Sequence, residues 1–155
     1  YNLPCKVTSI RHGIVMLGLE NLKRLCAVVA LAAFEDRPSY LLVNAMIRGR
    51  MCEVLAEQQD PNASGSFFFA GLLSHLDALL GVPTTEAVKA LPLTPDIEAA
   101  LTQQDGPIGE ALRRVRAWER GHWDETDAGS DATERIRRAY LEALRWAEES
   151  KQLLH

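Results

Sequence analysis

One stretch of the chain, residues 65–81, is apolar over almost its whole helical surface. Its sequence is GSFFFAGLLSHLDALLG, in which leucine and phenylalanine recur at spacings of three and four residues. A helix with so narrow a polar face has to be covered by neighbouring elements on most sides. The stretch is also too short, and too interrupted by polar residues, to cross a bilayer. We therefore predict one central core helix over residues 65–81, with Ser74, His75 and Asp77 as the polar positions where chemistry would be found.

The rest of the chain is also predicted to be helical. No segment alternates polar and apolar residues with a period of two, so we expect an all-α fold. Turn residues and capping signals separate helices expected over residues 8–18, 19–34, 38–59, 84–91, 95–104 and 108–120. A length of 155 residues is enough for one domain with a core. We predict a single-domain multi-helix bundle with a helical core over residues 1–123, a polar linker over 124–131 and a C-terminal helix over 132–155 packed on the core.

The helix expected over residues 38–59 carries a glycine in the middle of its apolar stripe, at Gly49. A mid-helix glycine costs roughly 1 kcal/mol relative to alanine, so its presence indicates close packing of another backbone. The charged residues of this helix lie off the stripe, and we expect a solvated face with local ion pairs. They are Arg48, Arg50, Glu53 and Glu57.

Charge and composition disfavour nucleic acid and membranes as partners. The net charge is −4, and no signal peptide or membrane-spanning run is present in the sequence. The helix over residues 108–120 turns four arginines outward, but glutamates lie at pairing distance and no aromatic residues alternate with the arginines. The residues concerned are Arg113, Arg114, Arg116 and Arg120, with Glu110 and Glu119. A nucleic-acid-binding domain is therefore only the third hypothesis, and a gel shift would test it.

The three cysteines, Cys5, Cys26 and Cys52, are odd in number and widely spaced. They fit neither a disulfide framework nor paired zinc ligands, and Cys26 and Cys52 lie in apolar helical runs typical of small core residues. A reducing cytoplasm is the expected compartment.

No catalytic, cofactor or metal site is predicted from the residues themselves. On one helix His75 and Asp77 would point about 200° apart, so they could not hold the same ion. The remaining histidines, at positions 12, 122 and 155, are isolated, and the motifs of phosphate loops, zinc sites and nucleophilic serine are absent. His75 is expected to be a partly buried, hydrogen-bonded residue.

Several segments together resemble the HDOD domain, a helical signalling domain related to the HD-type metal phosphohydrolases. Residues 7–18 (VTSIRHGIVMLG) and 22–25 (LKRL) are similar to its entry motif, and residues 48–56 and 67–81 to its next two signatures. Residues 91–97, 118–123 and 140–147 resemble the C-terminal part of a subgroup in which the domain follows an EAL domain, the cyclic-di-GMP phosphodiesterase type. The resemblance covers nearly the whole chain and implies an HD/HDOD-like bundle.

The chain departs from this pattern in two ways. HD hydrolases carry a consecutive His-Asp after the AGLL segment, whereas here residues 70–73 are followed by Ser74 and His75, so the resemblance implies a degenerate metal dyad. The family also has one or more helices before the position of Tyr1, so we expect a piece of a longer protein whose apolar surface is covered by missing chain, by the upstream domain or by a second copy.

The resemblance thus implies a non-catalytic regulatory and protein-interaction module of a bacterial signalling protein, fused downstream of an EAL domain. Its expected partners are that EAL domain and a second copy of itself, with no cofactor, nucleic acid or membrane. The alternative is a divergent HD-type metal-dependent phosphohydrolase that uses His75, Asp77 and acidic residues of other helices.

Overall fold

The computed structural model describes residues 39–59, 63–91, 93–122 and 129–153, which all belong to one unit spanning residues 38–155. These residues form helices and connecting turns and contain no strand, so the all-α prediction is confirmed for this part of the chain. The helices predicted over residues 8–18 and 19–34 lie outside it. The described helices are α2 (Ser39–Glu57), α3 (Ser64–Leu73), α4 (Leu76–Leu80), α5 (Thr84–Lys89), α6 (Pro95–Gln103), α7 (Gly106–Glu119) and α8 (Ser130–Leu153).

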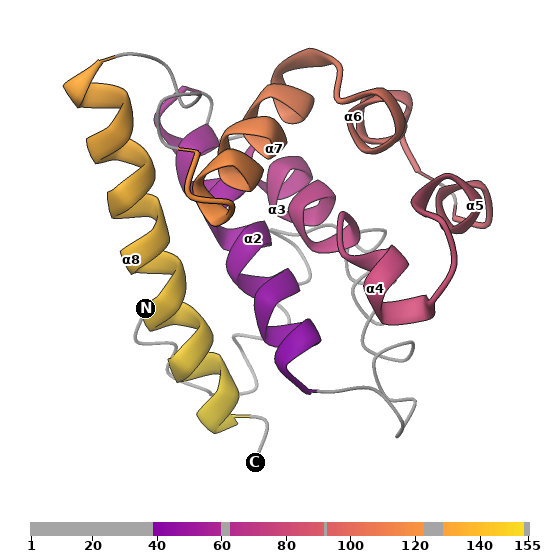
Figure 1. Cartoon of the computed structure of the whole chain (residues 1–155), viewed down its shortest axis with the longest axis horizontal. Coiled ribbons are helices and arrows are strands. Elements are labelled where there is room, and N and C mark those ends of the chain that lie inside the picture. Colours follow the sequence, from indigo (N-terminus) through magenta and orange to yellow (C-terminus); the bar gives the residue numbers. More distant parts are fainter. Residues whose placement is uncertain (1–38, 60–62, 92, 123–128, 154–155) are drawn as a thin grey trace, which may run out of the picture. The chain divides into compact units, whose positions relative to one another are not determined.

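Helix α2 packs against α3, α4, α7 and α8. Figure 1 shows it between α3 and α8, and it makes its most extensive contacts with these two helices. Helix α7 contacts both α2 and α3, α6 packs on α7, and α5 lies against α4 and α6. The predicted inner faces of α7 and α8 are buried at Leu112 and Val115 on α7 and at Ile136 and Ala143 on α8.

Two glycines allow α2 and α3 to approach closely. A Cβ atom on Gly71 would lie 2.7 Å from the Cα of Gly49, and one on Gly49 would lie 2.9 Å from the carbonyl oxygen of Phe68. Neither position has room for a larger residue unless the helices separate. The expectation that Gly49 marks close backbone packing is confirmed.

The prediction of one helix over residues 65–81 is wrong, because the helix is interrupted at Ser74 and His75, between α3 and α4. In a continuous helix the Gly71 carbonyl would accept from the N–H of His75. Here the Ser74 hydroxyl donates to that carbonyl at 2.6 Å, and the His75 N–H bonds instead to Leu72 O at 3.4 Å. A serine hydroxyl that competes for a backbone carbonyl in this way bends or ends a helix.

The boundaries of the later helices differ from the predictions by one or two residues. Helix α6 begins at Pro95 after Thr94, as predicted, although the Thr94 side chain forms no capping hydrogen bond. Helix α7 begins at Gly106, whose N–H donates to Asp105 Oδ1 at 2.9 Å. Helix α8 begins at Ser130. None of the helices in the described ranges is long and apolar enough to cross a membrane.

The prediction that α2 carries a solvated charged face is wrong for Arg50, although its local ion pairs are confirmed. Arg50 is 7% exposed and donates to Glu53 at 2.7 Å, to Glu57 at 3.0 Å and to Glu142 of α8 at 2.6 Å. The packing of α8 on this side of α2 accounts for the burial. Burial also raises the pKa of Glu53, an effect that its bond with Arg50 opposes.

Candidate functional site

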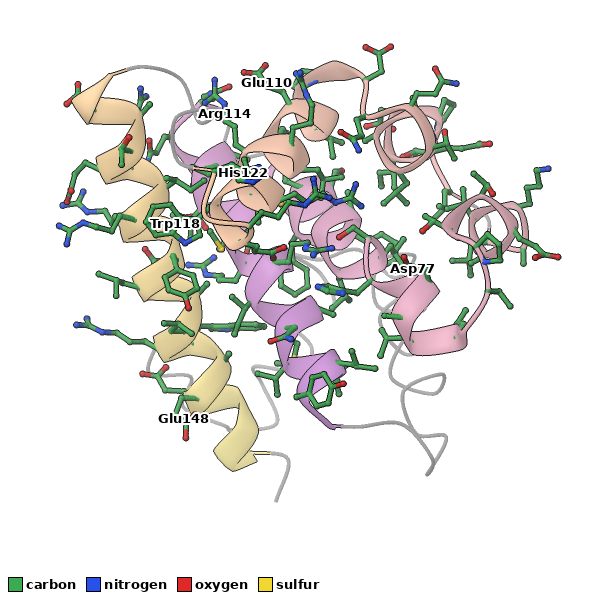
Figure 2. All side chains as sticks on the ribbon, viewed as in Figure 1. Asp77, Glu110, Arg114, Trp118, His122 and Glu148 are labelled. Carbon is green, nitrogen blue, oxygen red and sulfur yellow. The ribbon has the colours of Figure 1, made fainter. Side chains whose placement is uncertain are left out.

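The three sequence-predicted site residues lie in different surroundings. Ser74 is buried and His75 is half-buried at the junction of α3 and α4. Asp77 is exposed in the first turn of α4, where Figure 2 labels it, and its Oδ1 accepts from the N–H of Ala78 at 2.8 Å. The structure therefore brings Ser74 and His75 into the bundle and leaves Asp77 on its surface.

Arg48 of α2 reaches the Ser74 turn, which sequence reasoning did not anticipate. Its Nη1 donates to Ser74 Oγ at 2.9 Å and to Ser74 O at 3.3 Å. Its Nε and Nη2 donate to the two carboxylate oxygens of Glu119 on α7, at 2.9 and 2.6 Å. We call these three residues the Arg48 cluster. It joins α2, the junction of α3 and α4, and α7 through one guanidinium, in a two-pronged geometry that favours arginine over lysine.

The place of Arg48 in the sequence is a weak indication that its side chain lies near the neighbouring helix. It precedes Gly49, and the Gly71 position lies against the Arg48 carbonyl, where a Cβ would approach to 2.8 Å. A residue beside so close a backbone contact is forced near the neighbouring helix, whatever its polarity.

His75 is held in its neutral form. Burial lowers its pKa to about 4, and the charge of Arg48 lowers it further, while Glu119 and Asp77 act in the opposite direction. Its Nε2 atom is buried and has no hydrogen-bond partner among the residues that the structure describes, so the expectation of a hydrogen-bonded histidine is wrong for this atom within that part of the chain. Cys52 is fully buried nearby and burial raises the pKa of its thiol to about 12, as expected of a core cysteine rather than a nucleophile.

A surface concavity of about 470 Å³ opens beside the Arg48 cluster. Residues of α2, α7 and α8 line it together with His75. They are Asn44, Ile47, Arg48, Trp118, Glu119 and Tyr140. The rings of Trp118 and Tyr140 lie 5.9 Å apart between their centroids. The concavity thus combines an aromatic pair with a paired guanidinium and carboxylate.

Ser74 and His75, which the resemblance implied to be a degenerate metal dyad, are not arranged to hold a metal ion. Within the described ranges no group of three or more His, Cys, Asp or Glu residues is arranged to hold one. Ser74 Oγ already bonds to Arg48 and to Gly71 O. A divalent cation beside His75 would also meet the fixed positive charge of Arg48, which is electrostatically unfavourable.

Fold and site together define a helical bundle, in the part of the chain that the structure describes, with an arginine-centred polar cluster at the Ser74–His75 turn. Two proteins are similar to the chain. One is the cyclic di-GMP phosphodiesterase CdgJ of Vibrio cholerae, 29% identical over 160 residues, which include 98% of this chain and 37% of CdgJ. The other is the uncharacterized protein YuxH of Bacillus subtilis, 27% identical over 150 residues, which include 93% of this chain. The chain therefore spans about 37% of the length of these relatives. Neither a protein-family model nor a solved structure matches it.

Proposed function

We propose that this chain is a non-catalytic regulatory and protein-interaction module of a cytoplasmic bacterial cyclic-di-GMP signalling protein. In this proposal it is an HDOD-type domain that follows an EAL domain. The module couples the state of the EAL domain to a partner through helix-face contacts, without performing a reaction of its own.

The Arg48 cluster is the observation that carries the non-catalytic part of the proposal. A guanidinium bonded to Ser74 and Glu119 supplies a positive charge at the place where an HD-type enzyme would need a cation. His75 is neutral and could donate a lone pair, but Asp77 lies on the surface and no second ligand accompanies it among the described residues. The cluster instead connects three helical elements, which suits a structural or signalling role.

The similarity to CdgJ supports the signalling part. CdgJ is a cyclic di-GMP phosphodiesterase, and 63% of its length lies outside the aligned 37%. A catalytic EAL domain in that remaining portion would leave the aligned portion free to regulate. The alignment with YuxH likewise covers 37% of that protein's length.

Helix α8 offers a surface for protein contact. Leu141 and Leu144 are 48% and 36% exposed on it, three residues apart and thus on neighbouring positions of one helix face. Large exposed apolar side chains that lie together indicate an interaction surface. We assign this surface to the EAL domain or to a second copy of the chain.

A hydrolysis assay with metal analysis tests the proposal. The purified chain should contain no stoichiometric iron, manganese or zinc and should not hydrolyse cyclic di-GMP or other phosphate esters when these metals are added. Turnover that disappears in His75→Ala, but not in Asp105→Ala on the remote α7 N-terminus, would instead establish the divergent phosphohydrolase.

The regulatory role needs the full-length protein. Removing the segment, or replacing Leu141 and Leu144 by glutamate, should change the rate of cyclic di-GMP hydrolysis or the binding of a partner. The matched control replaces Arg137 by glutamine; Arg137 is exposed on the same helix and, among the described residues, bonds to Glu134. Full-length protein whose activity and partners are unaffected by removal of the segment would contradict the proposal.

A further inference from the structure

The outer side of α7 carries three arginines that form no ion pair with a carboxylate of the described residues. Arg113, Arg116 and Arg120 follow one another at spacings of three and four residues, which places them on one side of the helix. None of them forms an ion pair with another residue of the described ranges. We call these three residues the α7 arginine face.

The glutamates expected to neutralise these arginines are engaged elsewhere. Glu110 bonds to Arg114 at 2.6 Å, one turn along the same helix, and both are labelled in Figure 2. Glu119 bonds to Arg48 at 2.6 Å in the Arg48 cluster. Within the described residues, the α2–α7 contact therefore leaves the arginine face without an ion pair, although the whole chain has a net charge of −4.

The face is concave rather than flat. A concavity of about 380 Å³ is lined by the arginine face together with Gln104, Glu110, Arg114 and Ala117. This volume is within the range of about 300–1,000 Å³ typical of small-ligand sites. Four guanidinium groups and one carboxylate line it, so its charge selects for an anion.

One edge of the concavity is built by close backbone packing. A Cβ atom on Gly109 would lie 2.3 Å from the carbonyl carbon of Gln104, so only glycine lets α7 pack this closely on the end of α6. Gln104 itself has a left-handed backbone with φ of 56°. Its amide, a neutral hydrogen-bonding group, is thereby placed in the same concavity as Arg113, one helical turn beyond Gly109.

The environment of Arg116 favours an added anion. It is half-buried, and its pKa is lowered by burial and by the charges of Arg48 and Arg120, with Asp77 and Glu119 opposing. An anion placed between Arg116 and Arg120 would reduce this repulsion.

We propose that the concavity of Gln104, Arg113, Arg116 and Arg120 binds the phosphate groups of a small nucleotide. Guanidinium groups pair with phosphate through two parallel hydrogen bonds, and Arg113 and Arg120 are separated by about 10 Å along the helix, enough for a ligand with two phosphates. A cyclic dinucleotide fits this description, and naming it rests on the proposed function. Nucleic acid is disfavoured, because the chain's net negative charge repels a long polyanion.

Isothermal titration calorimetry of the whole chain tests the site, with cyclic di-GMP and pyrophosphate as separate probes. Each probe is titrated into the native chain, the double variant Arg116→Gln, Arg120→Gln, and the control Arg137→Gln. Arg137 has the same side chain, but on α8 and paired with Glu134. We expect each lost arginine of the face to weaken binding by about tenfold or more, with no change for the control. Thermal melts verify that the variants fold.

Loss of cyclic di-GMP binding in the double variant alone would support the proposal as stated. Binding of pyrophosphate without cyclic di-GMP would support a phosphate site but overturn its assignment to a cyclic dinucleotide. Absence of binding for both probes, or equal binding by the double variant, would overturn the site. Such a result would leave the proposed function intact, because that function is contradicted by metal-dependent turnover or by full-length protein that is unaffected by removal of the segment, and not by the absence of nucleotide binding.

Discussion

Replacing Gly71 by alanine should destabilise the bundle by separating α2 from α3. The added Cβ would lie 2.7 Å from the Cα of Gly49, 2.8 Å from the carbonyl oxygen of Arg48 and 2.9 Å from the Gly49 nitrogen. All three are backbone atoms, which cannot move aside by changing a rotamer. Relief therefore requires the helices to move apart, away from the contact that also positions Arg48 on Ser74.

The size of the effect follows from two opposing contributions. Overpacking a well-packed interior costs about 1–3 kcal/mol, and a clash with backbone belongs at the upper end. Alanine offsets about 1 kcal/mol of this through its higher helix propensity. The net loss is about 2 kcal/mol, which for a chain of this length corresponds to a decrease in Tm of roughly 4–8 °C.

Gly65→Ala is the matched control, because nothing lies within 4 Å of its added Cβ in the same helix. It should stabilise the chain by about 0.4–1 kcal/mol. Both variants are compared with the native chain by urea unfolding and by thermal melts followed by circular dichroism. If Gly71→Ala proves as stable as Gly65→Ala, the close α2–α3 contact is refuted.

Three further predictions concern Arg48 and Arg50 of α2 and His75 at the junction of α3 and α4. Arg48→Gln should raise the pKa of His75, since a positive charge that disfavours the imidazolium is removed, and NMR titration of the imidazole measures it. The free energy of unfolding should decrease as the pH falls from about 6.5 toward about 4. In this range His75 becomes protonated in the unfolded chain but stays neutral in the folded chain, because its folded pKa is lowered to about 4. His75→Gln should make this decrease smaller in urea unfolding at several pH values. Glu142→Gln should cost less than about 1 kcal/mol, because Glu142 is 45% exposed and Arg50 keeps Glu53, whereas Arg50→Gln should cost roughly 2–3 kcal/mol.

Each of these has an outcome that contradicts it. An unchanged His75 pKa in Arg48→Gln would mean that the guanidinium does not lie beside the imidazole. Identical pH profiles for the native chain and His75→Gln would show that another group controls the acid response. Equal losses for Glu142→Gln and Arg50→Gln would exclude a buried guanidinium shared among several carboxylates.

Local pattern alone was enough to predict the helical class and much of the packing. Spacings of three and four residues identified the buried positions Leu112, Val115 and Ile136, because each helix must turn its apolar side inward whatever it packs against. Gly49 likewise predicted a close backbone contact, because a glycine within a helix is otherwise unfavourable. These features depend on residues near one another along the chain.

The candidate site was decided by contacts between residues distant in sequence. Arg48 and Glu119 are 71 residues apart, and Arg50 and Glu142 are 92 apart, so no local pattern could place these arginines inside the bundle. The break at Ser74 likewise depends on a hydroxyl that bonds to Gly71 O while accepting from Arg48. Sequence determined which side of each helix is apolar. Only tertiary packing decided which charges pair. Burying a charged side chain is costly unless folding places an opposite charge beside it.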